Sequence, residues 1–243
     1  MKPILIIKAG ETFGKTRQAL GDFEDWILDR LGSRHPPVRL VAPFRHETMP
    51  GAEDVSAAIV TGSHHMVSDR EPWSERTASW LGQNLGRLPI LGICYGHQLL
   101  AHACGGRVGY HPGGVELGTA DVRLTAEAAA DPLFGALETQ GFPAHVAHRQ
   151  TVLELPAGAV RLAGNDFEPH HAFRLGSRAW GVQFHPEFNE QVAREYIVRQ
   201  KETFEANPGV IPRWLATIRP TPQATGLLER FAQIARGGAG PGC

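Results

Sequence analysis

The sequence predicts an α/β fold: an open, mostly parallel sheet with flanking helices and an antiparallel extension. In the first hundred residues, short apolar runs alternate with amphipathic stretches, which is typical of strands and helices wound into a parallel sheet. After Gly106 the pattern changes to short strands separated by turn signals, and no Pro-, Gly- or Ser-rich linker divides the two parts. We therefore expect both parts to contribute to one sheet.

The first half predicts four buried strands and two helices. The run PILIIKA is continuous, apolar and rich in β-branched residues, as expected of a strand buried on both faces. Leu20, Phe23, Ile27 and Leu31 recur at spacings of three and four, which indicates one face of a helix. The predicted strands are Pro3–Ala9, Val38–Phe44, Ser56–Ser63 and Leu88–Ile93, and the predicted helices are Thr16–Leu31 and Ser74–Leu85.

The second half predicts five further strands and two helices. We expect Thr221 to cap the last helix at its N-terminus, with Pro222 at the first helical position. The predicted strands are 115–124, 143–146, 160–163, 172–175 and 179–184, and the predicted helices are 189–206 and 222–236. We expect one domain over residues 1–236, and a disordered Gly-rich tail over residues 237–243.

Composition argues against several classes of protein. Of the 243 residues, 42% are hydrophobic and 20% are charged, which are ordinary values for a globular chain. The formal net charge is −1, so no global field attracts nucleic acid or anionic lipid, and no run approaches the ~18 apolar residues of a membrane span. Three cysteines are too few for a disulfide framework. These features favour a cytoplasmic protein without nucleic-acid or membrane partners.

The sharpest local signal surrounds Cys94. The stretch LPILGICYGHQLL (residues 88–100) places G-x-C-x-G between a buried strand and an apolar helix. This is the cysteine form of a nucleophile elbow, in which flanking glycines permit a strained turn that exposes the nucleophile above the sheet. At the start of a helix, a thiolate is stabilised by the helix dipole. The alternative is a buried structural cysteine beside a turn that tolerates glycine.

A second motif supplies a base and an acid. The apolar stretch AWGVQF (residues 179–184) is followed by His185, Pro186 and Glu187. In extended backbone, residues two apart share a face, so Glu187 is predicted to orient the ring of His185. Cys94, His185 and Glu187 have the residue types of a Cys-His-acid triad. The alternative is a surface histidine at a strand end.

These motifs carry a family resemblance. GICYGHQLL, GVQFHPEF and the intervening GGRVG resemble the class I, triad-type glutamine amidotransferases, especially the glutaminase domain of GMP synthetase and stand-alone relatives such as γ-glutamyl peptidases. The similarity extends from about Pro3 to Tyr196 and implies a flavodoxin-like core. It also implies roles for seven residues: Cys94 as nucleophile, His185 as base, Glu187 as its orienting acid, the backbone N–H groups of Gly62 and Tyr95 as oxyanion hole, and Gln98 and His148 near the substrate.

Two positions depart from the family pattern. Thr61-Gly62-Ser63 stands where the synthetase domain usually has Gly-Gly-Pro, and retains only the Gly whose N–H would be used. Gln150 stands where the family often has Asp, two residues after His148, and an amide supplies no charge for an α-amino group. The second departure bears on the identity of the γ-glutamyl donor.

The resemblance implies an amidohydrolase that attacks the γ-carboxamide of glutamine or a γ-glutamyl compound through a Cys thioester. We expect no metal or organic cofactor, because the histidines show no H-E-x-x-H spacing and no phosphate loop is present. The released ammonia would pass to a synthetase subunit, or the protein acts alone as a γ-glutamyl hydrolase, peptidase or transferase. A non-catalytic binding or regulatory relative of the same fold is the alternative.

Overall fold

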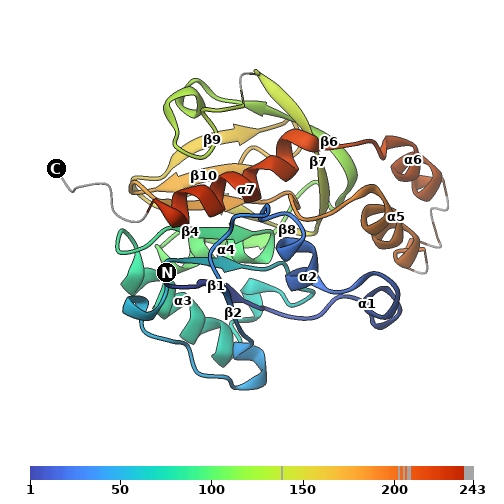
Figure 1. Cartoon of the computed structure of the whole chain (residues 1–243). Helices are drawn as coiled ribbons and strands as arrows, with labels where there is room; N and C mark the ends of the chain where they lie inside the picture. The colour runs from blue at the N-terminus through green and yellow to red at the C-terminus, as the bar shows by residue number, and fades with distance from the viewer. Residues whose placement is uncertain (138, 202, 205, 207–208, 238–243) are drawn as a thin grey trace.

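The computed structural model describes residues 1–137, 139–201, 203–204, 206 and 209–237. Within them, nine strands form one mixed sheet in the order β2-β1-β3-β4-β11-β10-β9-β6-β7, and β5 pairs with β8 in a separate two-stranded sheet. Helices cover both faces of the main sheet (Figure 1). The strands are β1 (Ile4–Ile7), β2 (Val38–Val41), β3 (Ala57–Val60), β4 (Ile90–Ile93), β5 (Arg107–Tyr110), β6 (Glu116–Leu124), β7 (Gly141–His148), β8 (Gln150–Glu154), β9 (Val160–Gly164), β10 (Ala172–Leu175) and β11 (Ala179–Val182).

The predicted fold class is confirmed. Strands β2, β1, β3, β4 and β11 run parallel to one another. Strands β10, β9, β6 and β7 continue the same sheet in antiparallel pairing. The sequence did not predict the β5–β8 pair, whose strands are short and lie outside the main sheet.

Side chains alternate between the two faces of each parallel strand, so the sheet packs against helices on both sides. Ile4 and Ile6 of β1 face one side of the sheet, and Leu5 and Ile7 face the other. The first side packs against α2 (Phe23–Leu28) and α7 (Pro222–Arg236), and the second against α3 (Pro72–Asn84) and α4 (Tyr95–Ala103). Helix α7 runs across its face of the sheet in Figure 1.

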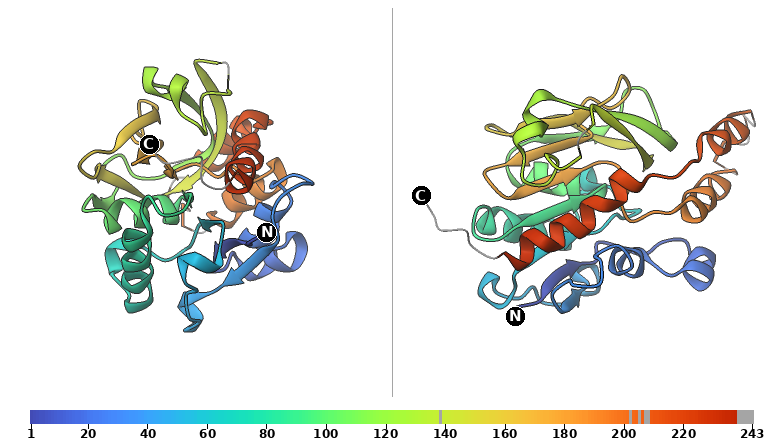
Figure 2. Two further views of the ribbon diagram at one scale, coloured as in Figure 1. Left: turned by 60° about the vertical axis from the view of Figure 1, so that its left-hand side comes forward. Right: turned by 45° about the horizontal axis from the view of Figure 1, so that its top comes forward.

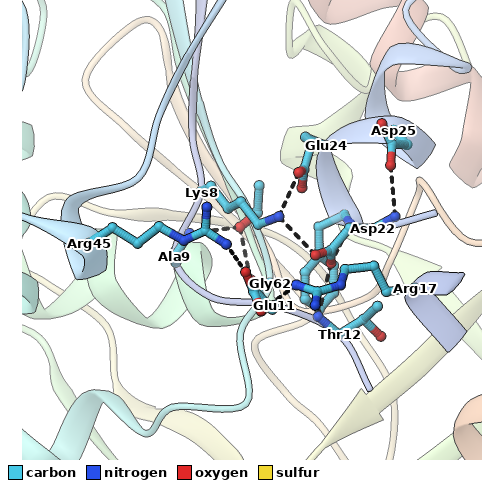
Figure 3. Close-up of polar contacts among 12 residues, drawn as sticks. Lys8, Ala9, Glu11, Thr12, Arg17, Asp22, Glu24, Asp25, Arg45 and Gly62 are labelled. Carbon is cyan, nitrogen blue, oxygen red and sulfur yellow. Dashed lines mark hydrogen bonds and ion pairs between the residues drawn. The ribbon is translucent and has the colours of Figure 1, made fainter. Parts of the chain in front are cut away.

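The predicted helix over Thr16–Leu31 is wrong, because the segment forms two helices. Helix α1 (Gly14–Leu20) ends at Gly21, whose φ of 82° lies in the region that glycine adopts without a Cβ clash. Asp22 then starts α2: its carboxylate accepts from the N–H of Phe23 and belongs to a capping box with Asp25 (Figure 3). The break places Asp22 in a buried network with Lys8.

Other predicted boundaries shift for local reasons. Strand β2 stops at Val41, two residues before Pro43, which lies in a short 3₁₀ turn. The predicted helix over 189–206 is shorter: α5 (Glu190–Arg199) starts at Asn189, whose side chain accepts from the N–H of Val192. Helix α6 (Val210–Thr217) was not predicted, and it lies beside α5 at one end of the molecule (Figure 2).

The last helix has the predicted bounds. Helix α7 starts at Pro222, but the side chain of Thr221 makes no capping hydrogen bond, contrary to the prediction. Its apolar face packs on the chain's own sheet. Residues 238–243 of the predicted tail lie outside the described residues, and one domain over residues 1–236 stays a prediction. Among the described helices, none combines the length and apolar character needed to cross a membrane.

Candidate active site

The candidate site lies at the carboxyl ends of three neighbouring parallel strands. Strand β4 lies between β3 and β11, and the three run in the same direction. Gly62 follows β3, Cys94 follows β4 and His185 follows β11. In open α/β sheets this edge is where loops gather functional groups. The topology therefore brings together residues that are more than one hundred positions apart.

Cys94 occupies the sharp turn that the sequence predicts. Its φ of 50° and ψ of −97° are strained for a non-glycine residue, and α4 begins at the next residue. The two flanking glycines are required by close backbone approach. A Cβ on Gly92 would lie 2.3 Å from the carbonyl oxygen of Gly96, and a Cβ on Gly96 would lie 2.5 Å from that of Val60. The elbow packs so tightly on the sheet that neither glycine has room for a side chain.

His185 and Glu187 are in direct contact. The Nδ1 atom of His185 lies 2.8 Å from Oε1 of Glu187, and both side chains are buried. The predicted geometry is wrong in one respect, because β11 ends at Val182 and Pro186 and Glu187 lie in a turn rather than in extended backbone. The turn, not strand pleating, brings the carboxylate to the ring.

The surroundings of His185 favour its charged form. Phe188 stacks on the imidazole at 4.0 Å between ring centroids, and Phe23 lies parallel on a longer contact of 6.5 Å. Burial by itself would lower the pKa of His185, but the charges of Glu187 and Cys94 outweigh it and raise that pKa above its ordinary value. An imidazole held in this way stabilises a neighbouring thiolate. Within the described residues, Nε2 of His185 has no hydrogen-bond partner.

Gly62 and Tyr95 lie beside these groups. A Cβ on Gly62 would lie 3.0 Å from Cε1 of His185, so the loop after β3 passes directly along the imidazole. Tyr95 is the first residue of α4, and its hydroxyl lies 2.5 Å from Oγ of Ser74 in the interior. Neither backbone N–H donates a hydrogen bond to another described residue. Both are therefore available to an acceptor at the site.

A cavity of about 360 Å³ opens in front of Cys94. Among the predicted site residues Cys94, Tyr95, Gln98 and His148 line it, as does Gln150, whereas His185, Glu187 and Gly62 are not among the lining residues. The sulfur is 3.8 Å from the carbonyl oxygen of Ala147, another residue of the cavity wall. A cavity of this volume is large enough for a small molecule next to the thiol.

Gln98 and His148 line the cavity, but their polar atoms are mostly bound within the protein. The Nε2 of Gln98 donates to the carbonyl oxygen of Gln150 at 2.7 Å and to Oε1 of Gln183 at 2.9 Å. The ring nitrogens of His148 lie 3.0 Å from the carbonyl oxygen of Gln150 and 2.9 Å from Oε2 of Glu116. Within the described residues, Oε1 of Gln98 makes no hydrogen bond and is available to a ligand, whereas both ring nitrogens of His148 have partners.

The side-chain amide of Gln150, the position that departs from the family pattern, is hydrogen-bonded within the protein. Its Nε2 donates to Oγ of Ser68 at 2.6 Å, and its side chain is buried. The cavity wall therefore has no carboxylate at this position.

The sequence did not single out several residues that line the cavity. Arg149 is adjacent to two residues of the motif, so its position was a usable signal. The other four residues come from the loop after β1, the loop after β3 and helix α5, and belong to no sequence motif. These residues are Phe13, His64, Arg149, Tyr196 and Arg199.

The part of the chain that the structure describes contains no group of three or more His, Cys, Asp and Glu side chains arranged to hold a metal ion. Glu116 does approach two histidines, His148 at 2.9 Å and His171 at 3.3 Å. Its second oxygen accepts from Asn165, so the carboxylate is already used in hydrogen bonds. Although burial alone would raise it, these histidines hold the pKa of Glu116 well below its usual range.

Comparison with known proteins identifies the family. Residues 20–203 match the model of the class-I glutamine amidotransferases, so the chain belongs to this family. It is 38% identical over 140 residues to GMP synthase [glutamine-hydrolyzing] of Porphyromonas gingivalis, covering 56% of this chain and 26% of that protein. It is 31% identical over 144 residues to gamma-glutamyl peptidase 5 of Arabidopsis thaliana, covering 58% and 57%. The matches thus span about a quarter and just over half of these relatives.

Solved structures agree on the fold. A glutamine amidotransferase from Thermotoga maritima superposes with a TM-score of 0.74 at 18% identity, covering 97% of this chain and 98% of that one. A glutamine amidotransferase from Methylobacillus flagellatus gives a TM-score of 0.75 at 22% identity, covering 100% and 97%. The parallel core and antiparallel extension are therefore the architecture of this family.

Proposed function

We propose that the protein is a Cys-His-Glu amidohydrolase that cleaves the γ-carboxamide of glutamine or of a γ-glutamyl compound. The observation that carries this proposal is the strained Cys94 in the wall of a cavity, within electrostatic reach of an imidazole that Glu187 orients. A buried non-catalytic cysteine has no need of a left-handed backbone or of a charged partner in the interior. Both features have a cost in stability that catalysis explains.

In the proposed reaction, the Cys94 thiolate attacks the γ-carbonyl carbon, and the C=O electrons move onto oxygen. The resulting oxyanion accepts hydrogen bonds from the N–H groups of Gly62 and Tyr95. His185, protonated, then gives its proton to the departing ammonia or amine as the C–N bond breaks. Water, deprotonated by His185, hydrolyses the γ-glutamyl thioester and restores the thiolate.

The roles of the remaining residues follow from their contacts. Glu187 fixes the ring orientation and stabilises the imidazolium, as the acid does in other triads. Gln98 offers Oε1 to a substrate N–H, because its Nε2 is bound to Gln150 and Gln183. His148 positions the wall of the cavity rather than binding substrate through a free ring nitrogen. No metal or organic cofactor is needed for these steps.

The fate of the nitrogen divides the proposal in two. The similarity to a glutamine-hydrolyzing GMP synthase supports transfer of ammonia to a synthetase partner, and the similarity to a gamma-glutamyl peptidase supports an independent hydrolase. The neutral Gln150 does not favour either, because glutamine and γ-glutamyl amides carry the same α-amino group. Glutaminase activity that appears only when cell extract is added would support the partner.

Substitution of the nucleophile tests the proposal. We expect Cys94→Ala to abolish release of glutamate and ammonia from glutamine, and of amine from γ-glutamyl amides. The matched control is Cys104→Ala, because Cys104 is a half-buried thiol at the end of α4 and does not line the cavity. An electrophilic glutamine analogue should label Cys94 faster than Cys104. Undiminished turnover by Cys94→Ala would refute the proposal, and equal labelling rates would favour a non-catalytic module.

A further inference from the structure

The charged groups of the cavity wall are unbalanced. Arg149 and Arg199 both line it, and the described lining residues include neither Asp nor Glu. The nearby buried carboxylates are already engaged, Glu116 with His148 and Glu187 with His185. The ligand therefore meets positive charge that the described wall does not compensate.

The two arginines differ in their partners. Arg199 forms an ion pair with Glu195, one turn earlier on α5, at 2.9 Å. Arg149 is half-buried, and in the described part of the chain its guanidinium has one hydrogen bond, from Nη2 to the neutral Oε1 of Gln200 at 2.6 Å, and no ion pair. The bond to Gln200 holds the guanidinium in place and leaves its other N–H groups available. A preorganised guanidinium of this kind is suited to a planar carboxylate.

We propose that Arg149 binds a carboxylate of the γ-glutamyl substrate, so that the cavity favours donors that bear this carboxylate over donors in which it is an amide. This inference rests on the proposed function for the reaction, but the binding it describes does not depend on turnover. The carboxylate has two sources: the α-carboxylate of the γ-glutamyl group, or one on the amine portion, as in a γ-glutamyl amino acid.

The position of Arg149 in the chain supports the assignment. Ala147, two residues earlier, has its carbonyl oxygen 3.8 Å from the Cys94 sulfur. The neighbours on either side, His148 and Gln150, turn their side chains into buried hydrogen bonds with Glu116 and Ser68. Arg149 is thus the residue of this segment that offers a charged side chain to a ligand at the nucleophile.

Equilibrium binding to the Cys94→Ala protein, which cannot turn substrate over, tests the inference. The probes are two matched pairs, γ-glutamylglycine with γ-glutamylglycinamide, and glutamine with its α-amide; each pair differs in one carboxylate. We expect Arg149→Gln, in that background, to weaken binding of a carboxylate-bearing probe roughly ten- to a hundredfold and its amide partner by less than threefold. The pair that shows the difference identifies the source of the carboxylate.

The controls separate the outcomes. Arg149→Lys should recover part of the affinity, since it retains the charge without the planar fork. Arg123→Gln removes an exposed arginine that pairs with Asp166 away from the cavity, and should change no affinity. Equal affinities of both proteins for all four probes, or no binding of any probe at millimolar concentration, would overturn the inference. Binding that depends on Arg149 without turnover by the unmodified protein would sustain it and refute the proposed reaction.

Discussion

Gly62 provides a test of how closely the site is packed. A methyl group at this position would lie 3.0 Å from Cε1 of His185 and 3.1 Å from Cε1 of Phe23. Ordinary carbon–carbon contacts begin at about 3.5 Å, so Gly62→Ala requires the imidazole, the phenyl ring or the loop to move by about half an ångström. The backbone N–H of residue 62 remains, so the substitution changes geometry without deleting the proposed oxyanion donor.

The expected cost follows from this overlap. Overpacking of this size in a filled interior destabilises a protein by about 1–3 kcal/mol, so the variant should still fold. The imidazole of His185, the proposed base, is one of the groups in contact, and misplacement of a catalytic group by up to 1 Å lowers turnover by as much as about a hundredfold. We therefore expect kcat to fall roughly ten- to a hundredfold in a coupled assay of glutamate release, with an unfolding transition that remains cooperative.

The control is Gly226→Ala on α7, where an added Cβ meets no atom within 4 Å. That substitution should stabilise the helix by up to about 1 kcal/mol and leave kcat unchanged. Full activity in Gly62→Ala would show that the loop after β3 does not press on the imidazole, and would refute this reasoning. Loss of folding in Gly62→Ala would be equally contrary to the stated magnitude.

Three further predictions concern stability. Lys8→Met removes a buried ammonium 2.7 Å from the Asp22 carboxylate, and should lower the free energy of unfolding, measured in urea at pH 7.5, by about 3–5 kcal/mol. A loss below 1 kcal/mol would contradict this prediction. Burial lowers the pKa of His145 to about 4, so below pH 6.5 the native protein binds fewer protons than the unfolded chain, and its stability falls as the pH falls. His145→Gln should therefore remove about 2 kcal/mol of the stability that is lost between pH 7 and pH 5. Equal losses in the two proteins would contradict this prediction. Gly96→Ala should prevent soluble expression or lower the melting temperature by more than 10 °C, because the new Cβ would lie 2.5 Å from the Val60 carbonyl oxygen. A decrease of less than 3 °C would argue against this close approach.

The parts of the candidate site that the sequence predicts are formed by residues close together in the chain. The elbow at Cys94 needs glycine on both sides, so chemistry and backbone requirement appear within five consecutive residues. The pair of His185 and Glu187 is likewise formed within three residues. Short-range contacts of this kind depend on few torsion angles, so residue type and spacing predicted the contact, although not the turn that forms it.

The cavity wall could not be predicted in the same way. Phe13, Tyr196 and Arg199 reach it from the loop after β1 and from α5, which lie far apart in the chain. Their positions depend on how α5 packs, and an amphipathic pattern specifies which face is buried but not its partner. The pair of β5 and β8 was missed for a related reason, because its pairing joins strands about 40 residues apart. Non-local contacts of this type have no signature in a single sequence.

The broken helix at Gly21 shows how a missed local feature reaches the site. The carboxylate of Asp22 accepts from Lys8 and from the N–H groups of Thr12 and Phe23, which fixes the start of α2 (Figure 3). Phe23 is thereby held against both Gly62 and the ring of His185. A continuous helix through Gly21 would have no such cap, and Phe23 would not be fixed at this point. The buried charge pair therefore acts, through Phe23, on the packing around the imidazole of His185.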